Sequence, residues 1–301
     1  MTIKQQLNEI ARTKKVPYKQ VLTHYVMERF LYRLSRSAYA DRLILKGGML
    51  LMGMGIAPAR TTMDIDLLGR LSNATQDMHK VVHDILHTRI GNSDGIEFSD
   101  SIHITQIMKE ALYSGVNVEV AVRVGGDSCT LSIDIGFSDI VHPKPNVMEY
   151  PVILPSSPSA HILCYPKEAI VAEKLESIAH LSTFNTRMKD FYDLWFLSQT
   201  YKFDFLTLKQ SLLTTFQHRH TALSSCNILT DSNFISTLQP AWASYMAKLK
   251  SSTFNRKPPV TLPPKDLSLV IQEILRWIQP VLDTEAVGQW SAKSGWKLRK
   301  S

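Results

Sequence analysis

Apolar residues recur at helical spacing in the first part of the chain. After Pro17 they follow a repeat of three to four residues (Val21, Tyr25, Val26, Phe30, Leu31 and Leu34), which predicts an amphipathic helix that begins at the proline. A shorter helix is expected over residues 2–12, and a further amphipathic helix over residues 73–90. The apolar stripes of these helices are most simply interpreted as faces of a hydrophobic core.

Strict alternation of polar and apolar residues marks the strands. Asn117–Val124 alternates throughout, which predicts a half-buried strand, and Gly125-Gly126-Asp127 predicts a hairpin turn to a return strand over residues 130–136. Short strands are expected at Leu43–Leu45 and Met63–Leu68, with a helix that opens at Gly48 between them. The first half of the chain is therefore expected to contain a mixed α/β fold.

The pattern becomes helical in the second half. Residues 142–158 are proline-punctuated, which predicts an extended loop, and the residues after Pro166 are mainly helical in pattern to the end, including an amphipathic helix over residues 266–282. The basic tail, residues 293–301, is expected to be mobile. We therefore expect two domains, an α/β domain over residues 1–160 and a helical domain over residues 161–301.

Composition is that of an ordinary globular protein with a basic surplus. The chain has 301 residues, 44% of them hydrophobic, 20% charged, and a formal net charge of +7. This surplus favours polyanionic ligands, nucleic acid first, although a solvated basic surface explains it equally well.

No apolar run reaches the roughly 18–20 residues of a membrane span, and the N-terminus lacks an apolar signal core. We expect a soluble cytoplasmic protein whose cysteines are reduced thiols, since their number is odd and their spacing does not suit zinc (Cys129, Cys164 and Cys226).

Two acidic residues on one predicted strand are the first candidate site. Asp64 and Asp66 are two positions apart, so their side chains point the same way, and two adjacent carboxylates repel each other unless a cation lies between them. A divalent metal ion removes that conflict. Upstream, Gly47 and Gly48 leave backbone N–H groups that a phosphate can approach closely. Together these residues predict a site for a metal ion and a nucleotide.

A third carboxylate, Asp134, lies between Ile133 and Ile135 on a predicted strand. An isolated buried charge is expensive, so either this carboxylate shares the metal site or it faces solvent from an edge strand. Three carboxylates, two Mg²⁺ ions and a nucleoside triphosphate form a coherent set for an in-line displacement. Asp134 is then the natural acceptor of a proton from the attacking hydroxyl.

Two residues of the helical half are weaker candidates. Lys174 can meet a triphosphate as a compact positive charge, but a lysine in an Ala-Glu-Lys helix is more often on the surface. Asp190 can position Lys174 or a nucleotide, or can simply balance the dipole of a helix start. The histidines considered as ligands (His103, His142, His161 and His180) do not form a metal-binding spacing. No nucleophile-elbow or Walker-type loop is present.

Five segments in order carry a resemblance to a known family. They are Leu45-Lys46-Gly47-Gly48, Arg60-Thr61-Thr62-Met63-Asp64-Ile65-Asp66, residues 131–139 (LSIDIGFSD), residues 165–174 (YPKEAIVAEK) and residues 187–194 (RMKDFYDL). Each is weak alone, but five in order at compatible distances are specific. Over about residues 40–200 the chain resembles the AbiEii/AbiGii nucleotidyltransferase toxins, within the DNA-polymerase-beta-like nucleotidyltransferase superfamily.

The resemblance implies a polymerase-beta-like nucleotidyltransferase core over residues 1–160, which the helical domain completes as an active site. Position by position, it implies metal-binding acids at Asp64 and Asp66, with Asp134 as the third acid, and further catalytic residues at Lys174 and Asp190. Six other residues of the matched segments are expected to bind the nucleotide: Lys46, Gly47, Gly48, Thr62, Arg187 and Lys189. The turn departs from the superfamily pattern, because Met49 follows Gly48 where many members have Gly-Ser. Backbone N–H groups can replace the missing hydroxyl.

The resemblance also implies a setting and a reaction. The protein is expected to be the toxin of a toxin–antitoxin system, with an antitoxin as its partner, and to move a nucleotide from a nucleoside triphosphate to RNA in a reaction that requires Mg²⁺. The expected acceptor is the 3′ end of tRNA, which would block translation. Two other interpretations stay open: an inhibitory module that binds nucleotide without transfer, and a kinase-like phosphotransferase.

Overall fold

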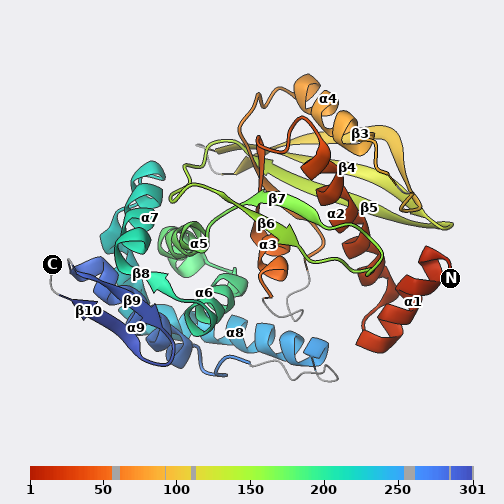
Figure 1. Ribbon diagram of the computed structural model, residues 1–301. Helices are drawn as coiled ribbons and strands as arrows, with labels where there is room; N and C mark the ends of the chain where they lie inside the picture. Colours follow the sequence, from red (N-terminus) through yellow and green to blue (C-terminus); the bar gives the residue numbers. More distant parts are fainter. Residues whose placement is uncertain (56–61, 92, 110–112, 254–261, 285, 300–301) are drawn as a thin grey trace. The chain divides into compact units, whose positions relative to one another are not determined.

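The computed structural model (Figure 1) describes residues 1–55, 62–91, 93–109, 113–253, 262–284 and 286–299. The chain forms two compact units. The first consists of Met1–Asp139 and Pro145–Tyr165, and the second of Ile140–Lys144 and Pro166–Ser301.

A seven-stranded sheet with the order β3-β4-β5-β2-β1-β7-β6 forms the centre of the first unit. Strand β2 runs parallel to β5 and β1 parallel to β7, whereas the other neighbours are antiparallel. The expected mixed α/β architecture is therefore confirmed. The strands are β1 (Leu43–Lys46), β2 (Ile65–Gly69), β3 (Ile96–Lys109), β4 (Tyr113–Val124), β5 (Asp127–Gly136), β6 (Asn146–Tyr150) and β7 (Ala160–Cys164).

Helices cover one face of this sheet. The helices of the first unit are α1 (Ile3–Lys14), α2 (Tyr18–Arg36), α3 (Gly47–Gly53) and α4 (Thr75–Leu86). Helix α2 packs on β5 and β7, α4 packs on β3, and α2 and α4 also contact each other. The predicted helices are thus confirmed, with ends that differ by a few residues from those expected.

The alternation in β4 and β5 places apolar side chains on one face of the sheet and polar side chains on the other. Val118, Leu131 and Ile133 are fully buried, whereas Asn117 and Asp134 are only half buried. The predicted half-buried strand and its hairpin are confirmed. The polar residues of the central strands therefore share the sheet face that is turned away from the apolar core.

The expectation of a loop over residues 142–158 is wrong in part, because β6 occupies residues 146–150 and pairs with β7. Strand β6 is an edge strand, and its flanking prolines, Pro145 and Pro151, lie just outside it. An edge strand tolerates prolines at its ends because they break no ladder hydrogen bond. The prolines therefore led to the prediction of a loop where the structure has a short strand.

The second unit is mainly helical, as expected. Its helices are α5 (Lys167–Leu181), α6 (Met188–Thr200), α7 (Phe205–His218), α8 (Ser232–Thr253) and α9 (Leu267–Asp283), with 3₁₀ turns at Ser182–Phe184 and Leu223–Thr230. A small antiparallel sheet of β8 (Phe203–Asp204), β9 (Val287–Ser291) and β10 (Gly295–Arg299) was not predicted.

The expectation of a mobile tail is wrong for the described residues 293–299. Strand β10 pairs with β9, and Trp296 lies opposite Trp290 in this pair. The indole nitrogen of Trp296 donates to the Trp277 carbonyl oxygen at 2.7 Å, so a hydrogen bond attaches the basic tail to α9. The Trp296 ring also packs against Phe205 and Trp290, with ring centroids 5.2 Å and 5.8 Å apart, and such aromatic contacts stabilise the strand.

Two further observations concern the whole of the described chain. None of its helices combines the length and the apolar composition that crossing a bilayer requires. Cys129, Cys164 and Cys226 are unpaired and buried, which agrees with the expectation of reduced thiols.

Candidate active site

Three carboxylates meet on the polar face of the central sheet. Asp66 on β2 lies directly opposite Asp134 on β5, because these two strands are parallel neighbours in register. Asp64 lies one residue before β2. One oxygen of each carboxylate lies within 4.8 Å of an oxygen of the other two, and all three residues are half buried. The structure thus brings together the three acids that the sequence selected.

Neighbouring donors orient each of the three carboxylates. The Thr62 hydroxyl donates to Oδ1 of Asp64 at 2.6 Å, and Nδ2 of Asn117 on β4 donates to Oδ1 of Asp134 at 2.8 Å. The backbone N–H of Gly48 donates to Oδ2 of Asp66 at 3.3 Å. Since each donor comes from a different segment, the fold of the first unit fixes the geometry of the cluster.

The two glycines are required by close packing against this cluster. Gly47 has a φ of +64°, and a Cβ atom there would lie 1.8 Å from Oδ2 of Asp66. A Cβ atom on Gly48 would lie 2.4 Å from the Thr62 hydroxyl oxygen. Only glycine allows the start of α3 to approach the acids this closely.

Lys46 borders the acids at the end of β1. It is the register partner of Asp66, and its Nζ pairs with Oδ2 of Asp139 at 2.6 Å beside the ring of Tyr165. The positive charge of Lys46 is therefore held in place next to the carboxylates. Arg60 and Thr61, which belong to the matched segment before Asp64, lie outside the described residues.

A second cluster of charges lies within the second unit. Nζ of Lys174 on α5 lies 2.8 Å from Oδ1 of Asp190 and 2.7 Å from Oδ2 of Asp193, both on α6. The carboxylates are fully buried and the side chain of Lys174 is only 11% exposed. Lys174 is thus a buried ion-pair residue, and its interpretation as a surface lysine is wrong.

Electrostatics in this cluster favour the ionised form of Asp190. Burial raises the pKa of its carboxyl, but the positive charges of Lys174, Arg187 and Lys189 outweigh burial, so the pKa of Asp190 is lowered below its ordinary value. Nε of Arg187 lies 3.0 Å from Oδ2 of Asp190, and the Arg187 side chain is 48% exposed. Lys189 is exposed on the first turn of α6.

Sequence reasoning missed two residues of these clusters. Asn117 was seen only as one polar position in an alternating strand, and the pairing of β4 with β5 was needed to place it beside Asp134. Asp193 lies three residues after Asp190, and this spacing was the available signal for a shared cation.

The acid cluster suits a hard divalent cation. Its donors are all carboxylate oxygens, and three of them are held on one face by hydrogen bonds to other groups. Oxygen-only donor sets are typical of Mg²⁺ and Mn²⁺ sites.

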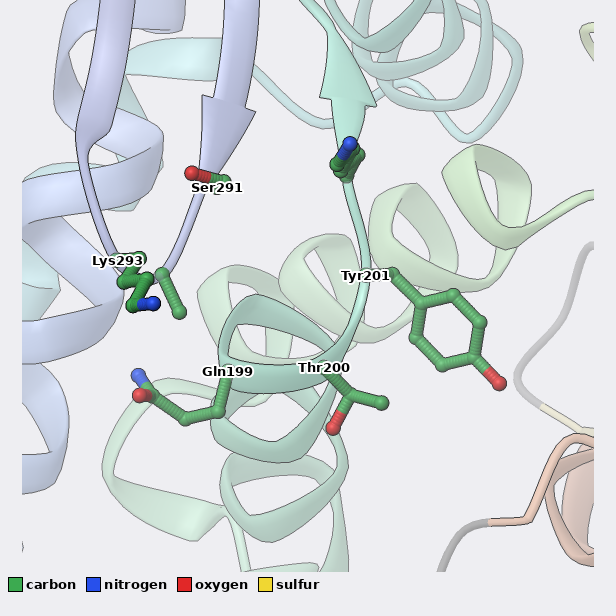
Figure 2. A pocket seen from close by; sticks show the side chains of 7 residues that line it. Gln199, Thr200, Tyr201, Ser291 and Lys293 are labelled. Carbon is green, nitrogen blue, oxygen red and sulfur yellow. The ribbon is translucent and has the colours of Figure 1, made fainter.

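A pocket within the second unit has a different character (Figure 2). It lies where the connection from α6 to β8 faces the turn between β9 and β10, and it contains none of the predicted site residues. No carboxylate, histidine or cysteine lines it, so it offers none of the usual side-chain ligands of a metal ion. Its lining residues are Gln199, Thr200, Tyr201, Lys202, Ser291, Ala292 and Lys293.

Comparisons with known proteins gave distant likenesses to individual chains. An isoleucine–tRNA ligase from Mycoplasmopsis agalactiae is 26% identical over 106 residues, which cover 34% of this chain and only 12% of the ligase. A crystal structure of a candidate nucleotidyltransferase from H. pylori has a TM-score of 0.45 and 17% identity, and covers 88% of this chain and 98% of that one. The crystal structure of JHP933 from Helicobacter pylori has a TM-score of 0.45 and 16% identity, and covers 86% of this chain and 93% of that one.

A family model gives the wider match. The model described as nucleotidyl transferase AbiEii toxin, Type IV TA system, matches residues 29–264. This span includes the three clustered acids, the glycine pair and the buried Lys174–Asp190 pair. The chain belongs to the AbiEii nucleotidyltransferase toxin family.

Proposed function

We propose that the protein is a toxin that transfers a nucleotide from a nucleoside triphosphate to an RNA acceptor in a reaction that depends on Mg²⁺. The observation that carries this proposal is the cluster of Asp64, Asp66 and Asp134 beside the glycine pair. Family membership supports the transferase class and the toxin role, and implies an antitoxin as partner.

Asp64, Asp66 and Asp134 would hold the metal. When bound, Mg²⁺ would neutralise charge on the triphosphate and on the attacking oxygen. Mg²⁺ is preferred over softer ions because the cluster offers only oxygen donors.

The residues of the chain position the groups that react. Gly47 and Gly48 let the start of α3 lie against Asp66 and Thr62, which would bring a phosphate bound at this helix start next to the acids, and Lys46 adds a positive charge at the end of β1. Asp134 accepts the proton of the RNA hydroxyl while the hydroxyl oxygen forms a bond to the α-phosphorus and pyrophosphate leaves. Asn117 keeps Asp134 in one orientation for this step through its hydrogen bond to Oδ1.

The positive charge of the chain fits an RNA acceptor. The formal net charge is +7, and phosphate contacts dominate the affinity of proteins for nucleic acids. We propose the 3′ end of tRNA as the acceptor on the basis of the family resemblance.

The test uses each of the four nucleoside triphosphates, labelled at the α-phosphate, with Mg²⁺ and total RNA. The wild-type protein should label RNA, and Asp64→Asn, Asp66→Asn and Asp134→Asn should each reduce labelling by more than about a hundredfold. Asp41→Asn is the matched control, since Asp41 is an exposed carboxylate outside the cluster. Full activity in Asp66→Asn would contradict the proposal.

The position of the label separates the alternatives. Transfer from the γ-phosphate, with none from the α-phosphate, would indicate a kinase-like phosphotransferase. Nucleotide binding without transfer of either label would indicate an inhibitory binding module.

A further inference from the structure

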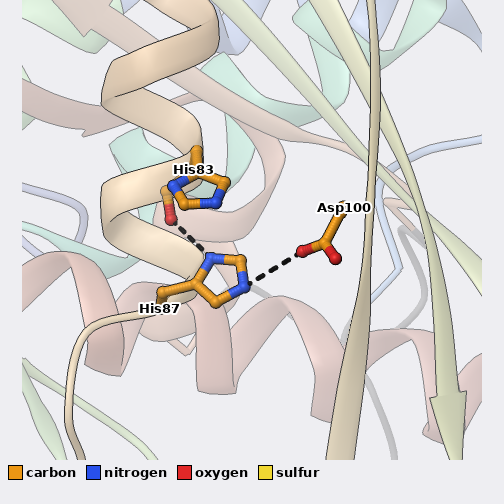
Figure 3. A group of neighbouring side chains, drawn as sticks. All are labelled: His83, His87 and Asp100. Carbon is orange, nitrogen blue, oxygen red and sulfur yellow. Dashed lines mark hydrogen bonds and ion pairs between the residues drawn. The ribbon is translucent and has the colours of Figure 1, made fainter.

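A second group of metal-ligating side chains lies in the first unit, apart from the three acids (Figure 3). His83 lies in the last turn of α4, His87 follows it by four residues and caps the end of that helix, and Asp100 lies on the neighbouring strand β3. One ligand atom from each residue lies within 4.8 Å of the other two. The side chains are 46%, 45% and 85% exposed, so an ion from solvent can reach them.

Hydrogen bonding directs one nitrogen of His87 towards Asp100. Nδ1 of His87 lies 2.9 Å from the carbonyl oxygen of His83, and a carbonyl can only accept, so this nitrogen carries a proton. The other nitrogen, Nε2, lies 3.3 Å from Oδ1 of Asp100. A backbone carbonyl that holds the second nitrogen is the usual arrangement around a metal-bound histidine.

The spacing of these atoms suits one shared ion. Two ligands that each lie about 2.0–2.2 Å from a tetrahedral ion are separated by about 3.3–3.6 Å, and Nε2 of His87 lies 3.3 Å from Oδ1 of Asp100. The ring of His83 stacks on that of His87, with centroids 4.2 Å apart and an angle of 24° between the planes. This stacking holds the two imidazole rings side by side at the end of α4.

We propose that His83, His87 and Asp100 form a site for a transition-metal ion of the Zn²⁺ class. Two imidazole nitrogens and one carboxylate oxygen are a donor set that such ions bind with water in the remaining position. Mg²⁺ prefers oxygen donors and is not expected here. A bound ion would tie α4 to the edge strand β3 and so stabilise the first unit.

The test titrates the full-length, metal-free chain with Zn²⁺ in excess Mg²⁺, which occupies oxygen-only sites. Isothermal titration calorimetry measures the affinity for Zn²⁺. The visible absorption of Co²⁺, bound in place of Zn²⁺, reports whether the ion is four-coordinate. The wild type should bind one ion at this site, its melting temperature should rise, and His87→Ala and Asp100→Asn should each weaken binding by at least about tenfold.

His79→Ala is the matched control, because His79 is an exposed histidine one turn before His83 and lies outside the cluster. It should bind Zn²⁺ as the wild type does. The three exposed substitutions should leave the melting temperature of the metal-free protein unchanged. Equal affinity in His87→Ala and His79→Ala, or no Zn²⁺ binding by the wild type, would overturn the proposal.

Discussion

Replacing Lys174 with methionine would remove the cation that lies between two buried carboxylates. Nζ of Lys174 is 2.8 Å from Asp190 and 2.7 Å from Asp193, and both acidic side chains are fully buried. Methionine keeps the volume of the stem but leaves the carboxylates without their shared partner. Removing one member of a buried ion pair costs about 3–5 kcal/mol, so we expect the second unit to lose stability by about this amount at neutral pH.

The loss should depend on pH in a defined direction. The folded-state pKa of Asp190 is lowered, so in the wild type its ionised form contributes stability above the unfolded pKa of about 3.9, and this contribution is lost as the pH falls through the folded pKa. In Lys174→Met, Asp190 is still buried, but the positive charge that lowers its pKa most is gone. The pKa of Asp190 should therefore rise. Protonation of Asp190 then removes the cost of an unpaired buried charge. The difference in the free energy of unfolding between wild type and variant should therefore narrow as the pH falls from about 7 towards about 5.

Urea unfolding, followed by tryptophan fluorescence and circular dichroism, measures this difference. Lys265→Met is the matched control, because Lys265 is an exposed lysine of the second unit outside this cluster, and it should stay within about 0.5 kcal/mol of the wild type. Adding Asp190→Asn and Asp193→Asn to Lys174→Met should recover part of the loss. A Lys174→Met protein within about 1 kcal/mol of wild type at neutral pH would refute the reasoning.

Three further substitutions test the acid cluster. Gly47→Ala should strongly reduce nucleotide transfer, since the new Cβ would displace Asp66. Gly126→Ala is its control, because Gly126 also has a positive φ but no atom lies within 4 Å of the Cβ position. This control should lower only the urea midpoint, by the equivalent of about 1 kcal/mol. Thr62→Val removes the hydroxyl that orients Asp64, and labelling assays should show about a tenfold to hundredfold loss of transfer without unfolding. Asn117→Ala should produce a loss of similar size through Asp134, and unchanged kinetics in both variants would show that neither donor positions an acid.

The local pattern of polar and apolar residues was sufficient to predict most of the strands and helices of the first unit. The alternation from Asn117 to Val124 and the Gly125-Gly126 turn predicted β4, its turn and β5, because one face of a half-buried strand must be apolar. Strands β6, β7, β9 and β10 were missed because each has only five residues and, unlike the equally short β2, none of them carries a recognisable motif. Pairing with distant segments, rather than propensity, determines such short strands.

The candidate site was predictable only in part for the same reason. The spacing of Asp64 and Asp66 is local, but Asp134 joins them through the pairing of β2 with β5, which is separated from β2 by about 60 residues of chain. Lys174 looked like a surface residue because its helix is rich in charged residues, and its burial depends on packing against α6. The family resemblance supplied what the local pattern could not.

The most direct test of the account is the binding of Mn²⁺, a spectroscopic substitute for Mg²⁺, to the metal-free protein, measured by electron paramagnetic resonance. The account predicts that the wild type and Asp41→Asn bind Mn²⁺ alike, and that Asp66→Asn and Asp134→Asn bind it at least about tenfold more weakly. Equal affinity in all four proteins would contradict the claim that the three clustered carboxylates hold the catalytic cation.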